Sequence, residues 1–210
     1  LYELDAQGKT IMFEGAQGVL LDVDFGQYPY VTSSHCTTLG VGIGTGFSPR
    51  KIGRVIGVAK AYPTRVGTGP FPTFAGDEDQ ALRDAGGEYG ATTGRPRYCG
   101  WLDIPAMKYA IKVGDVDEIA LTKTDILDGR ETIPVCVAYK YLDAVSTEYY
   151  TDTNMLENCE PVYEDWPGWD DVDGAEPFIQ KLEEALGVPV TMVGNGPNRA
   201  DLVIRENANV

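Results

Sequence analysis

Apolar side chains recur along this chain with two different periods, and the longer period predicts helices. The helical period is clearest over residues 104–113 and 177–186, and the second of these segments ends at Gly187. A shorter helix is expected over residues 77–86. Pro49 suits the first position of a helix, so we expect one that starts there and continues through Val55, Ile56 and Ala59.

Alternating positions and short continuous apolar runs predict strands, most of them followed by glycine-rich loops. The expected strands are 10–14, 118–121, 133–141 and 188–193. The expected loops are 15–18, 32–46, 66–73, 88–100 and 194–197. Residues 143–174 are acidic with few regular patterns, which predicts an elaborated excursion from the fold. The succession of strand, loop and helix indicates an α/β fold with ligand groups at strand ends, and no linker divides residues 1–210.

Composition and charge narrow the classes of partner. The 210 residues are 43% hydrophobic and 23% charged, which is typical of a folded domain with a real core. Lys and Arg number 17 against 32 Asp and Glu, a formal net charge of −15. Nucleic acid and anionic membranes are therefore disfavoured as partners, although a few local arginines suffice for a small anion.

Cysteine, histidine and the first residues exclude further classes. The chain has four cysteines without a Cys-x-x-Cys pair and a single histidine, His35, so reduced thiols in a cytoplasmic protein are expected and zinc motifs are excluded. No apolar run is long enough to span a membrane, and Leu1–Asp5 does not resemble a signal peptide. The segment lacks an initial Met and is typical of the tail of a helix, so we expect that an N-terminal portion is missing.

The sharpest local motif is Lys123-Thr124-Asp125, directly after an apolar strand. A carboxylate there can accept hydrogen bonds from N1–H and the exocyclic amine of guanine, a pair that adenine does not offer. The Lys123 stem can lie along the base. An alternative is an ordinary turn in which Asp125 caps a helix. The second strand-to-loop element, Gly194-Asn195-Gly196, favours guanine because exposed backbone N–H groups can donate to its O6, although it is also compatible with a tight turn.

A possible anion site follows residues 91–94. Arg95 and Arg97 flank Pro96, so their guanidinium groups point in restricted directions, beside the hydroxyls of Thr92 and Thr93. This arrangement suits a small carboxylate or phosphate. A surface turn whose arginines pair with nearby acids is equally compatible with the pattern.

Three further motifs resemble known functional signatures but do not fit them. Gly8-Lys9-Thr10 copies the end of a phosphate-binding loop, but its leading glycine position is Glu3 and a strand is expected where a helix should follow. The glycines at 40, 42, 44 and 46 do not form a dinucleotide fingerprint at any offset. His35 beside Ser33, Ser34 and Cys36 has no group to orient it as a base, so a structural role is favoured.

Ordered motifs along nearly the whole chain resemble adenylosuccinate synthetase, and the match is to the C-terminal half of that enzyme family. The matching segments are Phe13–Gly18, Tyr28–Ser34, Lys60–Tyr62, Thr64–Gly67, Gly69–Thr73, Gly90–Arg97, Gly100–Asp103, Thr122–Asp125 and Leu127–Gly129. The resemblance implies part of a mainly parallel sheet flanked by helices, like that of P-loop NTPases. It also implies a cytoplasmic, homodimeric ligase of purine biosynthesis that uses GTP and Mg²⁺.

The reaction implied by the resemblance joins IMP and L-aspartate to adenylosuccinate and releases GDP and phosphate. GTP would phosphorylate the 6-oxygen of IMP, and the aspartate amine would then displace that phosphate. The IMP-binding residues implied are Gln17, Leu21, Thr32, Val66 and Arg95. The aspartate-binding residues implied are Ala91, Thr92, Thr93, Gly94, Arg95, Pro96 and Arg97. The GTP-binding residues implied are Arg97, Lys123, Thr124, Asp125, Gly194, Asn195 and Gly196.

Three positions depart from the family pattern: His35, Phe74 and Tyr98 stand where Asn, Glu and Arg are usual. The family's catalytic base and acid, its phosphate loop and its Mg²⁺ ligands have no match here, so the resemblance implies that they lie upstream. The chain alone is expected to be inactive. The alternative function is a non-catalytic nucleotide-binding or assembly module of the same fold, and a GTP-hydrolysing switch is disfavoured because residues 91–97 have no role in simple hydrolysis.

Overall fold

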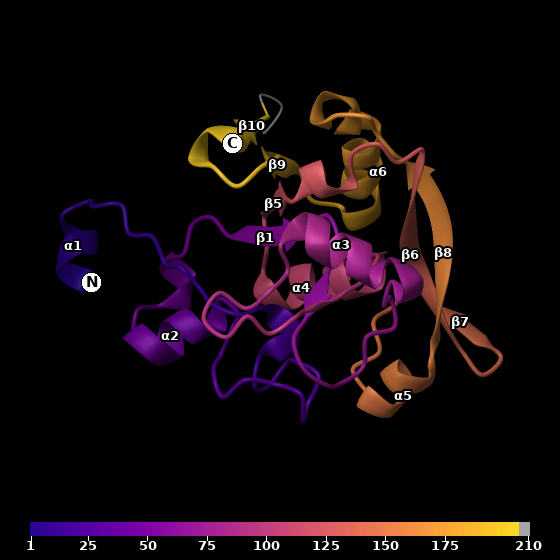
Figure 1. The fold of residues 1–210 in the computed structure, drawn as a ribbon. Helices are drawn as coiled ribbons and strands as arrows, with labels where there is room; N and C mark the ends of the chain where they lie inside the picture. The colour runs from indigo at the N-terminus through magenta and orange to yellow at the C-terminus, as the bar shows by residue number, and fades with distance from the viewer. Residues whose placement is uncertain (206–210) are drawn as a thin grey trace.

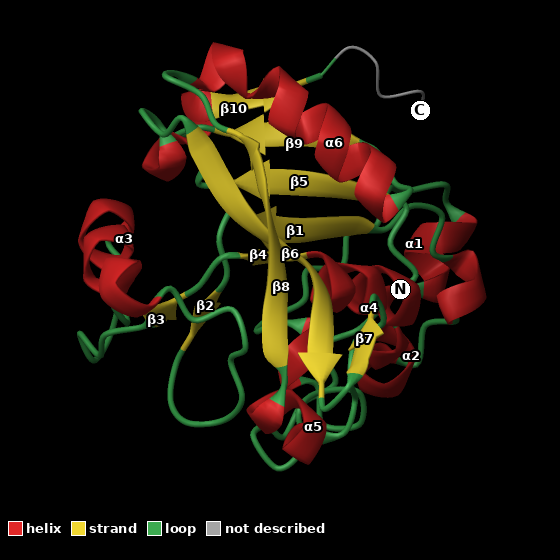
Figure 2. Ribbon diagram, turned by 90° about the vertical axis from the view of Figure 1, so that its right-hand side faces the viewer, coloured by secondary structure: helices red, strands yellow, loops and turns green. Residues whose placement is uncertain are grey.

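The main sheet brings together strands that are far apart in the sequence. The computed structural model describes residues 1–205, apart from the side chains of Val172 and Asp173. Its main sheet has the order β1 (Ile56–Lys60), β5 (Glu118–Thr122), β9 (Val190–Gly194) and β10 (Leu202–Ile204). The first three strands are parallel and β10 is antiparallel to β9, as Figure 2 shows. The predicted α/β fold with a mainly parallel sheet is confirmed.

Three helices were predicted from periodicity, and each has an identifiable end. They are α3 (Asp79–Gly86), α4 (Ile104–Gly114) and α6 (Glu176–Leu186). α4 begins where the Asp103 side chain accepts the backbone N–H of Ala106 at 3.0 Å, and α3 and α6 end at glycines in the left-handed conformation. The shorter helices are α1 (Tyr2–Ala6), α2 (Leu39–Thr45) and α5 (Thr153–Asn158).

A second group of strands is built on the long strand β6 (Thr132–Tyr141). β6 pairs with β4 (Leu102–Asp103), with β7 (Ala144–Ser146) and, along most of its length, with β8 (Glu160–Pro167). In Figure 2 the β6–β8 pair runs across the direction of the main sheet, and in Figure 1 it lies on the opposite side of the molecule from α1. The small β2–β3 pair joins Thr64–Arg65 to Tyr98–Cys99.

Two sequence predictions of elements are wrong, and a third is incomplete. Residues 10–14 are extended but pair with no strand of the described chain. Pro49 begins only a 3₁₀ turn, Pro49–Lys51, and the expected helix through Val55, Ile56 and Ala59 is replaced by β1, where β-branched residues favour a strand. The acidic segment 143–174 contains β7, α5 and β8, so it is more regular than expected.

The core lies where α4 and α6 meet the sheets. Its buried side chains include Ile119 and Leu121 of β5 and Phe178 and Leu182 of α6. Trp169 packs against Phe178 with ring centroids 5.0 Å apart. Because these apolar faces are covered, the polar strand ends of the main sheet are held in fixed positions. Within residues 1–205, no helix is long and apolar enough to cross a membrane.

Candidate functional site

Three strands of the main sheet end at the same edge, and the candidate base-binding residues follow two of them. In the register of the sheet, Lys60 lies opposite Thr122, and Thr122 lies opposite Gly194. The Thr124 hydroxyl donates to the Gly194 carbonyl at 3.3 Å. The structure therefore places the loops 123–125 and 194–196 side by side, although 70 residues separate these two partners in the sequence.

In the loop after β5, one buried carboxylate oxygen has no hydrogen-bond partner among the described residues. Lys123 adopts a left-handed conformation with φ of 64°, and its ammonium group donates to the Gly86 carbonyl at 2.7 Å. Oδ1 of Asp125 is buried and has no hydrogen-bond partner among the described residues. A buried carboxylate oxygen without a donor is costly, so it marks a position where a donor from a ligand would be stabilising.

Residues 88–97 form a narrow hairpin-like loop beside these strand ends. Tyr89 and Pro96 form an antiparallel bridge, and the Arg97 N–H donates to the Glu88 carbonyl at 2.9 Å. Nearer the tip, the Gly94 N–H donates to the Gly90 carbonyl at 2.8 Å. Residues 91–96 are exposed. The loop predicted to hold aspartate thus has an ordered base and a tip open to solvent.

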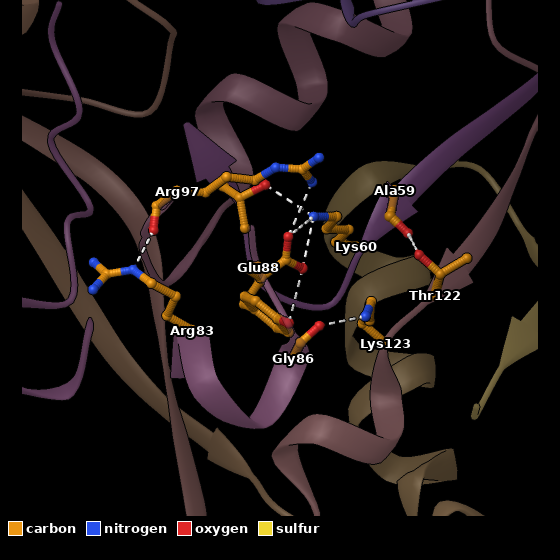
Figure 3. Close-up of polar contacts among 10 residues, drawn as sticks. Ala59, Lys60, Arg83, Gly86, Glu88, Arg97, Thr122 and Lys123 are labelled. Atoms are coloured by element: carbon orange, nitrogen blue, oxygen red, sulfur yellow. Dashed lines mark hydrogen bonds and ion pairs between the residues drawn. The ribbon is translucent and has the colours of Figure 1, made fainter. Parts of the chain in front are cut away.

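The base of this loop rests on a buried carboxylate. Both oxygens of Glu88 accept from the Lys60 ammonium at 2.8 Å. Tyr62 donates to Glu88 Oε1 at 3.1 Å, and Nη1 of Arg97 donates to Oε2 at 3.0 Å, as Figure 3 shows. Burial would raise the pKa of the Glu88 carboxyl, but the bonds and charge of Lys60 outweigh burial and hold the pKa below its ordinary value.

The two arginines of the loop are placed differently. Arg97 is partly buried, its carbonyl accepts from Nε of Arg83 at 2.7 Å, and its own Nε is buried without a partner among the described residues. Arg95 lies at the exposed side of the loop. Among residues 1–205, no hydrogen bond joins Arg95 to the other candidate IMP residues; its backbone N–H donates to the Thr93 hydroxyl at 3.4 Å.

The remaining candidate IMP residues are connected through a second network. The Thr32 N–H donates to the Leu21 carbonyl at 2.8 Å. Arg65, next to Val66, donates to the carbonyl of Pro70 and to the side-chain oxygen of Gln27. The backbone N–H of Gln27 in turn donates to the Leu20 carbonyl. Gln17 is exposed, with Cys36 Sγ 3.9 Å from its Oε1. Leu21 and Thr32 are thus in direct contact, whereas Val66 is connected to this part of the chain only through its neighbour Arg65.

Of the three departures from the family pattern, Tyr98 lies opposite Arg65 in the β2–β3 pair. Phe74 and Tyr98 pack edge to face, with ring centroids 5.8 Å apart at 84°, so the two changes form one aromatic pair. His35 lies 3.3 Å from Asp24. Asp22, Asp24 and His35 come close enough to surround an ion, but the oxygens of Asp22 already accept backbone N–H groups of Asp24, Phe25 and Cys36.

Sequence reasoning missed Glu88 as a functional candidate and left Lys60 and Tyr62 without a role. Glu88 appeared only as the first residue of a polar loop. Its partner Lys60 lies 28 residues earlier, at the end of a strand that was predicted as a helix, so no local spacing could join them. The signal present in the sequence was a glutamate at a predicted helix-to-loop boundary, which is common in any protein.

Comparisons with known proteins agree on one family. The family model "Adenylosuccinate synthetase" matches residues 1–203. Proteins named adenylosuccinate synthetase from Halothermothrix orenii and Citrifermentans bemidjiense are 50% and 47% identical over 98% and 99% of this chain. The structure of fully ligated adenylosuccinate synthetase from Plasmodium falciparum superposes with a TM-score of 0.93 at 39% identity, over 98% of this chain.

The matches cover only part of the other proteins. The chain spans 51% of the length of each of these two bacterial relatives and 52% of the Plasmodium chain. A cyanophage S-2L succinoaminodeoxyadenylate synthetase superposes with a TM-score of 0.60 at 23% identity, a likeness that extends to the fold alone.

Proposed function

This chain belongs to the adenylosuccinate synthetase family, and on that premise we propose that it carries the base-reading and aspartate-holding parts of a GTP-dependent ligase site. The reaction proposed is the joining of IMP and L-aspartate to adenylosuccinate, with release of GDP and phosphate. Residues 1–210 act as one unit in this proposal. A cytoplasmic homodimer is the form in which we propose that the complete site works.

The observation that carries the proposal is the buried, unpartnered Oδ1 of Asp125 beside the loop 194–196. Guanine presents two adjacent N–H donors to such a carboxylate, whereas adenine presents an acceptor at N1. Backbone N–H groups of residues 194–196 would meet O6 of the base. Lys123, held by the Gly86 carbonyl, would cover the base with its aliphatic stem.

We assign L-aspartate to the tip of the loop 88–97. Arg97 supports this assignment because its buried Nε has no partner among the described residues and can donate to a carboxylate. Ala91, Thr92, Thr93 and Gly94 are exposed residues at the tip, and the two threonines offer hydroxyl groups there. Arg95 would turn from the exposed side of the loop to the ribose of IMP and to aspartate.

IMP is assigned to the region bordered by Gln17, Leu21, Thr32 and Val66. The hydrogen bonds between Leu21 and Thr32, and between Arg65 and the Gln27 side chain, support a preformed wall for a ligand. With IMP fixed there, transfer of the terminal phosphoryl group of GTP to the 6-oxygen makes that oxygen a good leaving group. The aspartate amine then forms the new C–N bond as phosphate leaves.

The family's use of Mg²⁺ finds no suitable ligands in the described part of this chain. Mg²⁺ prefers an octahedral set of oxygens, and the candidate group contains His35 together with Asp22, whose oxygens already accept backbone N–H groups. The residues present do not fit the ion.

Calorimetric titration of the chain with GDP and, separately, with ADP tests the guanine assignment, with IMP present at millimolar concentration in both. The expected result is saturable binding of GDP and much weaker binding of ADP. Equal affinities for GDP and ADP would overturn the assignment of Asp125, and binding of neither would overturn the proposal that this chain holds a working base pocket.

A further inference from the structure

We propose that Glu88 is a positioning residue: it fixes the guanidinium group of Arg97, and with it the loop 88–97, against the end of β1. This inference rests on the proposed function, because Arg97 is assigned there to aspartate. Its first basis is the isolation of Glu88, whose side chain is only 2% exposed. A carboxylate removed from water to this degree is stable only when strong donors surround it.

The donors around Glu88 come from separate parts of the chain. Lys60 and Tyr62 belong to the end of β1 and the residues after it, and Arg97 belongs to the far side of the loop. Lys60 also donates to the Thr64 hydroxyl at 2.9 Å, so it is itself held in place. One carboxylate therefore ties the loop to the main sheet, as Figure 3 shows.

Arg97 makes three hydrogen bonds in this arrangement, and only one of them involves its own side chain. Its N–H donates to the Glu88 carbonyl, and its carbonyl accepts from Arg83. These two backbone contacts place the Cα but leave the long side chain free to rotate. The 3.0 Å bond from Nη1 to Glu88 Oε2 restricts the guanidinium, so that the unpartnered Nε keeps one direction.

Charge gives the same result as geometry. Lys60 and Arg97 bind one carboxylate, and Lys123 acts on it electrostatically, so two positive charges remain uncompensated by Glu88 itself. This excess can attract an anionic ligand, but without Glu88 the cations would repel one another and separate. Glu88 thus allows cations to stay close together before a ligand arrives.

The same residue lies near the base-reading loop. Lys123 donates to the Gly86 carbonyl, two residues before Glu88, at the C-terminal end of α3. This contact uses the backbone and does not depend on the Glu88 side chain. Loss of the Glu88 charge should therefore disturb the aspartate side of the site while leaving the guanine side in place.

The first test needs no variant and no ligand. In NMR spectra of the chain labelled with ¹³C and ¹⁵N, the Arg97 Nε–H signal is expected to shift at the same pH midpoint as the ¹³C signal of the Glu88 carboxyl. This midpoint should lie below the ordinary pKa of glutamate. Arg65, whose Nε donates to the Thr68 carbonyl at 3.2 Å and which pairs with no carboxylate of the described residues, is the internal control and should not follow that midpoint. An Arg97 Nε–H signal that does not change as Glu88 titrates would overturn the proposal.

The second test uses Glu88→Gln, which keeps the shape and removes the charge, with Glu148→Gln at an exposed position as the matched control. Glu88→Gln is expected to let the Arg97 guanidinium rotate faster, because the bond that restricts it is weakened. L-Aspartate binding should weaken about 10- to 100-fold, with GDP affinity changed by less than about threefold. Glu88→Asp should recover part of the loss. Equal losses for GDP and aspartate, or no change in Arg97, would contradict a positioning role.

The two proposals can fail separately. A wild-type chain that binds neither GDP nor aspartate would count against the proposed function, while the Arg97 and Glu88 signals would still decide the positioning role. A Glu88→Gln chain that does not fold, judged by its thermal transition and amide spectrum, leaves the titration of the wild-type chain to decide it.

Discussion

At the scale of single residues, the candidate site depends on polar atoms that the protein buries without giving them partners. Asp125 Oδ1 and Arg97 Nε are two such atoms among the described residues. Each costs free energy in the ligand-free chain, of the order of 1–3 kcal/mol for a buried polar group. A ligand that supplies the missing donor or acceptor recovers that cost, which makes these atoms selective for hydrogen-bond pattern more than for size.

Replacing Asp125 should therefore change which base is preferred. Asp125→Asn cannot accept both N–H groups of guanine, and its amide can donate to the 2-oxo group of xanthine. We expect GDP affinity to fall about 10- to 100-fold and xanthosine diphosphate to become the better ligand. Calorimetry with both nucleotides measures this, with the exposed Asp143→Asn as the control. An unchanged preference for GDP would show that Asp125 does not read the base.

Gly86 makes a different prediction, about stability. A Cβ at Gly86 would lie 1.9 Å from the Tyr62 hydroxyl, closer than any real contact. Gly86→Ala should lower the free energy of unfolding by about 1–3 kcal/mol, measured by chemical denaturation. Gly44→Ala is the control, because a Cβ there meets nothing within 4 Å in helix α2.

A double variant separates this clash from the general cost of changing Gly86. Tyr62→Phe removes the hydroxyl, so part of the loss in Gly86→Ala should be recovered when both are present. Additive losses in the two variants would place the cause elsewhere than in the hydroxyl contact.

At the scale of elements, sequence patterns succeeded where the signal is local and failed where it depends on a partner. The helix α4 was predicted from its period, and its first turn also carries Asp103 and Pro105, whose capping roles are local chemistry. In β1, the apolar residues Ile56 and Ala59 were taken for part of a helix, because Pro49 supplies a start signal that a single 3₁₀ turn already satisfies.

The candidate site was predicted in the same uneven way. Lys123-Thr124-Asp125 and Gly194-Asn195-Gly196 each follow an apolar strand, so their position at strand ends could be predicted. Their adjacency depends on the parallel pairing of β5 with β9, which no short-range pattern encodes. Glu88 could not be found at all, since its significance arises from three donors brought in by tertiary structure.

The capping residue of α4 yields a prediction about pH. Burial raises the pKa of the Asp103 carboxyl to about 6, against hydrogen bonds from Tyr139 and Ala106, whereas its ordinary value is 3.8. The folded chain therefore retains this proton over the interval in which the unfolded chain has lost it. Its contribution to stability falls as pH rises from about 4 to about 6.

Asp103→Asn removes this titration while keeping an oxygen for the Ala106 N–H. The difference in unfolding free energy between the variant and the wild type should therefore move in favour of the variant between pH 4 and pH 6. Urea denaturation of both chains at several pH values measures it. A difference that stays constant with pH would show that Asp103 does not titrate in this interval.

At the scale of the whole molecule, the main sheet has an open edge. β1 is the first strand in the order, and no strand of the described chain pairs with its other side. Val58 is 76% exposed and Ile56 is 44% exposed on this strand. An apolar edge strand is able to pair with a strand of another molecule. The net charge of −15 opposes that pairing because equal charges repel at short range.

Self-association of the chain should therefore depend on salt. We expect sedimentation experiments to show a larger associated fraction at about 1 M than at about 0.1 M ionic strength, because the repulsion is screened. Val58→Lys places a charge on the edge strand and should suppress the associated fraction at both. Glu148→Gln, which changes the net charge by the same single unit away from the edge, is the control. Because both variants weaken the overall repulsion, equal suppression by both would show that the edge strand is not the contact.

The parallel pairing in the main sheet also determines when, during synthesis, the two loops of the candidate base-binding site come together. Residues 123–125 leave the ribosome long before residues 194–196, yet these two loops lie side by side only when β9 has paired with β5. Sequence-distant pairings of this kind form slowly because the intervening chain must be closed first. A nascent chain that ends before Gly194 therefore lacks part of the proposed base pocket, and a nucleotide bound there would stabilise the fold only after β9 has been translated.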